Sequence, residues 1–138
     1  MDFKQLIAGA LIGLVSCGTF AAPEWEFVDT IDSGFAIYVD TNSIGRVSEY
    51  SSQATHKAWI KQIVYKDLEQ DGLAIGDYRM ILYWVHCNNR TIGTKSVTTY
   101  QKQKNGLVRN NTASTSYPKM DDLIPNSIGE GIVDTVCS

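Results

Sequence analysis

The chain has 138 residues and a mass of 15.3 kDa, which suits a single domain, and its 43% apolar content is that of a globular protein rather than a disordered one. Twelve basic residues against fifteen acidic residues give a net charge of -3 at pH 7. Because the sequence has no basic stripe to neutralise a phosphate backbone, the composition argues against a nucleic-acid partner.

The first residues have the pattern of a secretory signal peptide. Lys4 precedes an apolar run over residues 6–15, and small residues follow this run. Ten apolar residues span only about 15 Å as a helix, roughly half of the hydrocarbon core of a bilayer, so a permanent transmembrane helix is disfavoured. We therefore predict a signal peptide over residues 1–21 and one domain over residues 22–138.

Two processing routes compete in this region. Thr19 and Ala21 supply the small residues that signal peptidase requires for cleavage before Ala22, which discards Cys17. In the alternative, residues 14–17 (LVSC) resemble a bacterial lipobox, in which Cys17 becomes a lipidated first residue that anchors the protein to a membrane. The peptidase site is the better match. We therefore expect a soluble exported protein, in the periplasm or at the outer surface, and keep lipidation of Cys17 as the alternative.

The middle of the chain has mainly the two-residue hydrophobic period of β-strands. Six strands are predicted, over residues 25–31, 35–41, 56–65, 78–87, 95–103 and 107–110. Turn signals at residues 32–34 and 104–106 join the first two and the last two strands into hairpins. The fourth strand is the most apolar, which is typical of a central strand, and a polar loop over residues 110–122 is expected to follow the sixth.

A short amphipathic helix is predicted at the C-terminus. The apolar positions after Asn126 repeat with helical spacing: Ile128, Ile132, Val133, Val136 and Cys137. Ser127 and Glu130 fit a capping box at its start. Two glycines weaken the segment by roughly 1 kcal/mol each relative to alanine, so the helix needs further support to be stable.

A disulfide is expected to supply that support. On either processing route Cys17 leaves the count, and Cys87 and Cys137 remain as a pair in an oxidising compartment, which favours one disulfide over two free buried thiols. The bond would close a loop of about 50 residues and contribute roughly 4 kcal/mol. The predicted fold is α+β, with a single antiparallel sheet of about six strands and a C-terminal helix that the disulfide holds on one face.

No residue set predicts catalysis, a cofactor or a metal. His56 and His86 lie outside any recognisable catalytic motif. Asp67, Glu69 and Asp71 copy the first half of a calcium loop, but the carboxylate that should close such a loop is missing. The aromatic residues could furnish a recognition face, although we expect most of them in the core or half exposed on strands, with Trp25 packed under the sheet.

Several segments, taken in order, resemble one protein family. They are a tryptophan just after the signal peptide and the segments YVDTNSI, AWIKQIVY, YWVHC and IPNSIGEGIVDTVC. Together they resemble the surface-adhesin protein E family of Gram-negative bacteria, over residues 25–137. The resemblance implies an antiparallel sheet whose C-terminal helix is tied down by a Cys87–Cys137 disulfide. It also implies an adhesin that binds host extracellular-matrix and plasma proteins.

Our leading hypothesis is an exported, non-enzymatic module that binds a protein partner through a sheet face or through loops. The alternative is a periplasmic accessory or inhibitor-like protein, which binds another protein without an adhesive role. In both cases membrane contact is expected only if Cys17 is lipidated.

Intact mass spectrometry of the exported protein tests the two processing routes. Cleavage before Ala22 removes Cys17, so we expect a mature chain that begins at Ala22 and carries no added mass. A chain that begins at Cys17 and carries the mass of attached acyl groups would contradict this expectation and support the lipobox route.

Overall fold

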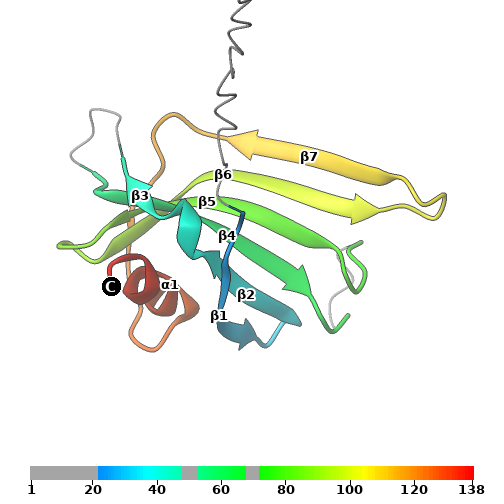
Figure 1. Ribbon diagram of the computed structural model, residues 1–138, viewed down its shortest axis with the longest axis horizontal. Helices are drawn as coiled ribbons and strands as arrows, with labels where there is room; N and C mark the ends of the chain where they lie inside the picture. The colour runs from blue at the N-terminus through cyan, green and yellow to red at the C-terminus, as the bar shows by residue number, and fades with distance from the viewer. Residues whose placement is uncertain (1–21, 48–52, 68–71) are drawn as a thin grey trace, which may run out of the picture.

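The computed structural model describes residues 22–47, 53–67 and 72–138, so the predicted signal peptide and Cys17 lie outside the described residues. Within these ranges, six main strands form one curled antiparallel sheet in the order β1-β2-β4-β5-β6-β7, and one α-helix follows them (Figure 1). This arrangement confirms the predicted α+β fold. The described residues contain no helix with the length and hydrophobicity of a transmembrane segment.

The elements follow the chain in a simple order. The main strands are β1 (Trp25–Ile31), β2 (Phe35–Asp40), β4 (His56–Val64), β5 (Tyr78–His86), β6 (Thr91–Lys102) and β7 (Val108–Ser114). Two short strands, β3 (Gly45–Arg46) and β8 (Asp121–Asp122), pair with β4 and β6 respectively. A 3-10 turn, η1 (Thr41–Ser43), follows β2, and α1 (Ile128–Val136) comes last. As predicted, β5 is a central strand, between β4 and β6.

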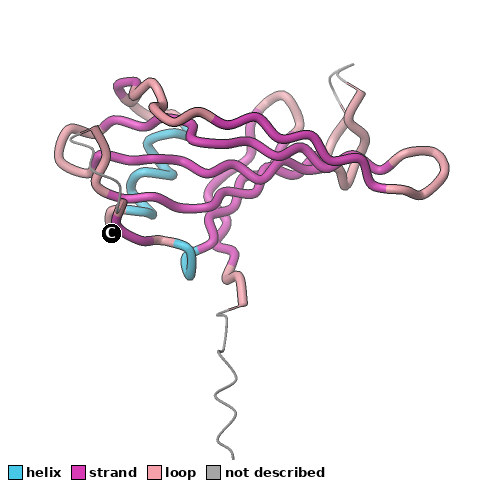
Figure 2. Tube along the Cα trace, turned by 90° about the horizontal axis from the view of Figure 1, so that it is seen from above, coloured by secondary structure: helices cyan, strands magenta, loops and turns pink. Residues whose placement is uncertain are grey.

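The prediction of a polar loop over residues 110–122 is wrong for part of this segment. Strand β7 continues to Ser114, and residues 121–122 pair with β6. All seven residues of β7 are exposed, and the residues beyond the predicted strand end at position 110 are mostly polar, so the hydrophobic pattern does not indicate that the strand continues. The strand forms because it pairs with β6 in an unbroken register, to which a hydrogen bond of 2.9 Å between the Thr98 and Thr112 hydroxyls adds. The β6–β7 hairpin projects past the rest of the sheet (Figure 2).

Helix α1 begins where the sequence predicts. The Ser127 Oγ accepts a hydrogen bond of 3.3 Å from the backbone N–H of Glu130, which caps the helix. The helix contacts β1, β2 and β4 and buries part of the predicted stripe: Ile132, Val133 and Val136. Gly131 allows the close approach to β1, because a Cβ at this position would lie 2.9 Å from Cγ1 of Val28.

A disulfide fastens the end of this helix to the sheet. It joins Cys87, which directly follows β5, to Cys137, which directly follows α1, with 5.7 Å between the two Cα atoms. This confirms the predicted pairing. A helix of nine residues with two glycines is marginal alone, so the bond and the buried stripe together keep it in place.

The core lies between α1 and the sheet. Its largest fully buried side chains come from three strands and the helix: Val39, Ile60, Val85 and Val133. Tyr83 packs against this cluster, and burial raises the pKa of its phenol above the ordinary value, while a hydrogen bond with Thr94 acts in the opposite direction. The Tyr83 hydroxyl therefore stays neutral at physiological pH.

Replacement of both Cys87 and Cys137 by alanine is expected to lower the free energy of unfolding by roughly 4 kcal/mol, because the unfolded chain regains the entropy of an open loop. Urea unfolding followed by tryptophan fluorescence measures the change. Reduced wild-type protein is the control, and its free energy of unfolding should fall by the same amount relative to the oxidised protein. A double variant as stable as the oxidised wild type would refute a stabilising role for the bond.

Candidate functional site

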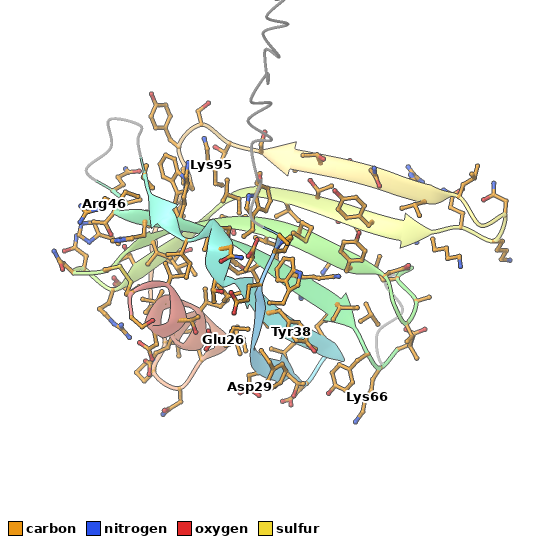
Figure 3. All side chains as sticks on the ribbon, in the orientation of Figure 1. Glu26, Asp29, Tyr38, Arg46, Lys66 and Lys95 are labelled. Atoms are coloured by element: carbon orange, nitrogen blue, oxygen red, sulfur yellow. A yellow bond between two sulfur atoms is a disulfide. The ribbon has the colours of Figure 1, made fainter. Side chains whose placement is uncertain are left out.

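The sheet face opposite α1, which we call the open face, carries aromatic residues in place of the aliphatic core. Paired residues of an antiparallel sheet share a face, so the register defines its rows. One row contains Phe27, Tyr38, Lys61 and Met80. The next contains Ile63, Tyr78 and Tyr100. Tyr38 is labelled on β2 among the side chains of the sheet in Figure 3. Ile60, between Lys61 and Trp59 in the chain, points to the core instead.

Two hollows lie on the open face, and Trp25 lines both of them. The first has a volume of about 190 Å³ and is lined by Trp25, Tyr38, Lys61 and Ile63. The second has a volume of about 240 Å³ and is lined by Pro23, Trp25, Asp40, Trp59, Met80, Thr98 and Tyr100. Because the indole of Trp25 borders both hollows, they form one surface, which we call the aromatic groove.

Ring contacts fix the orientation of the aromatic side chains. Phe27 and Tyr38 meet edge to face, with centroids 5.5 Å apart and planes at 61°. Tyr78 and Tyr100 stack at 4.7 Å with planes at 18°. Phe27 is nevertheless 54% exposed, which is unusual for a phenylalanine in a small domain. The rings of Tyr38 and Tyr100, which line the groove, are therefore already ordered, and Phe27 adds exposed apolar surface beside Tyr38.

Lys61 places a positive charge inside this aromatic surface. Its Nζ lies 4.5 Å from the ring centroid of Tyr78 and 5.8 Å from that of Trp25, so both rings attract it through cation–π contacts. The contacts hold the ammonium group beside the first hollow, where it can meet an acidic or carbonyl group of a ligand.

Asp40 ties the start of the described domain to the rim of the groove. Its Oδ1 accepts backbone N–H groups of Glu24 at 3.0 Å and of Asn42 at 3.1 Å. The Asn42 side-chain amide in turn donates to the carbonyl oxygen of Ala22 at 2.6 Å. These bonds fix the segment that contains Pro23, which lines the second hollow. The end of the groove is thus built by polar contacts rather than by packing alone.

The two histidines considered as catalytic candidates do not line this groove. His56 has its Nδ1 2.9 Å from the Thr55 Oγ1 and 3.3 Å from the Cys87 Sγ, at the disulfide. His86 accepts the backbone N–H of Asn89 at 3.0 Å. The two histidines lie on opposite faces of the sheet, because His56 pairs with Val85, the residue before His86.

The partial calcium-loop motif falls largely outside the described residues. Asp67 is exposed, whereas Glu69 and Asp71 belong to the segment that the structure does not describe. Among the described side chains, no group of three or more potential metal ligands comes together. The arrangement that the structure does present on the open face is the aromatic groove.

Sequence reasoning misses the groove for a specific reason. Trp25, expected under the sheet, instead lines the open face and borders both hollows. The groove combines Tyr38, Lys61 and Tyr100 from three separate strands, and their proximity depends on strand order and register. The available signal is that aromatic residues occupy the alternate positions that do not belong to the aliphatic core.

Comparison with known proteins gives one result. The family model described as surface-adhesin protein E matches residues 25–138, which include every element of the fold. Searches of curated proteins and of solved structures give no match.

Lys61→Gln is expected to lower the free energy of unfolding by about 1 kcal/mol, because it removes the cation from two aromatic rings. Urea unfolding measures the loss. Lys57→Gln is the matched control, since Lys57 lies on the same strand and the same face without a cation–π contact to a described ring. Equal losses in the two variants would show that general charge, and not the aromatic contacts, accounts for the effect.

Proposed function

The chain belongs to the surface-adhesin protein E family, and we propose that it is an exported, non-catalytic binding module that holds a protein partner in the aromatic groove. The observation that carries this proposal is the groove itself, an ordered aromatic surface on the open face of the sheet. Membership of an adhesin family supports a binding role rather than a catalytic one.

The composition of the groove resembles the centre of a protein interface. Such centres are rich in tryptophan, tyrosine and methionine, and they have a polar rim. Trp25 and Tyr38 supply the aromatic anchors, while Lys61 and Asp40 supply charged groups beside them. Because ring contacts already order several side chains, binding loses little rotamer entropy.

The division of the groove into two hollows favours a partner that inserts individual side chains. With volumes of about 190 and 240 Å³, each is smaller than the roughly 300–1,000 Å³ of a typical small-molecule pocket. Each hollow instead suits one or two side chains. A protein segment that lies across Trp25 can place side chains in both hollows at once. We propose that host extracellular-matrix and plasma proteins, the class that the family resemblance implies, supply this segment.

Export completes the proposal. We propose that residues 1–21 are removed as a signal peptide and that the domain acts at the outer surface, in keeping with a family of exported surface proteins. In the alternative, Cys17 is lipidated and anchors the protein to a membrane. Protease treatment of intact cells separates an adhesin from a periplasmic accessory protein, because a surface domain is digested. Complete protection would favour the periplasmic role.

Trp25→Ala is expected to weaken binding to immobilised extracellular-matrix or plasma proteins by at least about tenfold, because truncation of a central aromatic anchor removes a large share of the binding energy. Surface plasmon resonance with the purified domain measures the affinity. Tyr117→Ala is the control, since Tyr117 is 81% exposed and lines neither hollow. A retained native unfolding midpoint in Trp25→Ala shows that the variant is folded. Equal affinities for wild type and both variants would place the interface outside the groove.

A further inference from the structure

A second, chemically different pocket lies on the other face of the sheet. The register brings five polar side chains to this face from three strands. Arg79 of β5 pairs with Thr99 of β6, and Thr99 pairs with Asn111 of β7. One row further, Gln101 pairs with Arg109. With Leu73, these five residues line a pocket of about 190 Å³.

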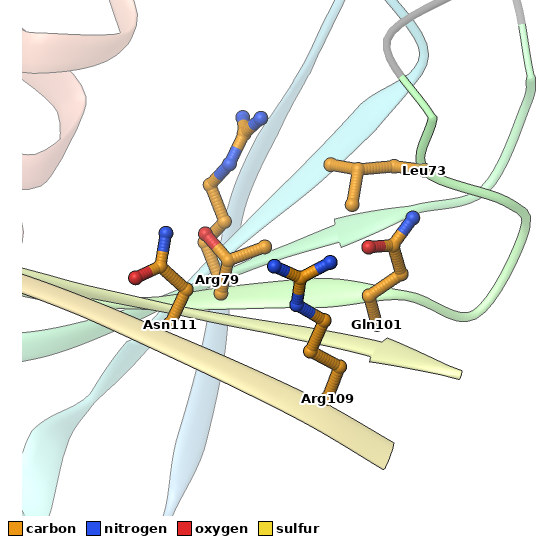
Figure 4. A pocket seen from close by; sticks show the side chains of 6 residues that line it. Leu73, Arg79, Gln101, Arg109 and Asn111 are labelled. Carbon is orange, nitrogen blue, oxygen red and sulfur yellow. The ribbon is translucent and has the colours of Figure 1, made fainter. Parts of the chain in front are cut away.

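Residues 72–77, which lead into β5, close one side of this pocket. Leu73 is only 7% exposed and is the one apolar side chain among the described residues of the lining. Gln101 anchors the neighbouring backbone, because its Nε2 donates a hydrogen bond to the carbonyl oxygen of Gly72. The same bond directs the side chain of Gln101 toward the pocket wall, where Figure 4 shows it next to Leu73.

Asp77 fixes residues 74–77 to β6, and it is not among the residues that line the pocket. Its carboxylate is 4% exposed and accepts two backbone N–H groups, from Ala74 at 2.9 Å and from Lys102 at 3.0 Å. A carboxylate with two such bonds is satisfied where it lies. Asp77 therefore acts as a clamp between this segment and β6.

Among the described residues, the charged members of the lining are two arginines. Arg79 has its guanidinium carbon 5.3 Å from the ring centroid of Phe35, which orients the side chain. Arg109 is exposed, and it has no hydrogen-bond or ion-pair partner within the described part of the chain. Figure 4 shows its guanidinium group between the side chains of Asn111 and Gln101.

We propose that this pocket is an oxyanion site, which binds one carboxylate or sulfate group of a ligand. A guanidinium fork matches the paired oxygens of such groups, and the carboxamides and the Thr99 hydroxyl add donors without charge. Because the pocket is smaller than a typical small-molecule site, it accommodates the anionic group rather than a whole organic ligand. The site lies on the face opposite the aromatic groove and does not depend on the function proposed for that groove.

Nuclear magnetic resonance titration of the oxidised protein tests the site. Sodium sulfate and sodium acetate are added in separate series, and sodium chloride keeps the ionic strength constant, because exposed charges are screened by salt. We expect the side-chain amide resonances of Gln101 and Asn111 to shift and saturate in at least one series, with an affinity in the millimolar range. The series that saturates identifies which of the two anions the pocket prefers.

Variants assign the effect to the pocket. Arg109→Gln should weaken the affinity by at least about tenfold, and Arg109→Lys should weaken it less, because lysine keeps the charge and loses the fork. Lys104→Gln is the matched control, since it removes an exposed cation from the same hairpin outside the lining. Equal saturation in wild type and Arg109→Gln, or a linear drift without saturation in all proteins, would overturn the proposal.

Discussion

The bond between Cys87 and Cys137 is the constraint on which the rest of the structure depends. It connects the end of a central strand to the end of a short helix that has two glycines and little intrinsic stability. Once the helix is fixed there, its apolar stripe covers the aliphatic side chains of β1, β2 and β4. The opposite side of the sheet carries aromatic side chains instead, and these form the aromatic groove.

The same two-residue alternation therefore produces three environments. Near α1, the inward positions of β4 and β5 are aliphatic and form the core, as Ile60 and Val85 do. Beyond the helix, the same face becomes polar and carries Arg79 and Arg109. The outward positions carry rings and Lys61. The alternation of a strand assigns each side chain to one face of the sheet. What packs against that face then decides whether it becomes core, polar pocket or aromatic groove.

Much of the fold can be predicted because its signals are local. The alternation of six segments, the Ser127 cap and an even pair of mature cysteines are all legible in the sequence. Two features are not. The second half of β7 is polar and exposed, so pairing with β6 creates it without any hydrophobic signal. The candidate sites need side chains from strands far apart in sequence, and only the register reveals that Tyr38 and Lys61 are neighbours.

The two edge strands of the sheet, β1 and β7, differ in how readily they can pair with an additional strand. At β1 the register is interrupted between Phe27 and Asp29, and α1 packs against the strand. Irregular, covered borders of this kind resist the docking of another strand. At β7 the register is unbroken and every residue is exposed, so alternate backbone groups point away from β6. Within the described chain, an additional strand can therefore extend the sheet past β7 far more readily than past β1.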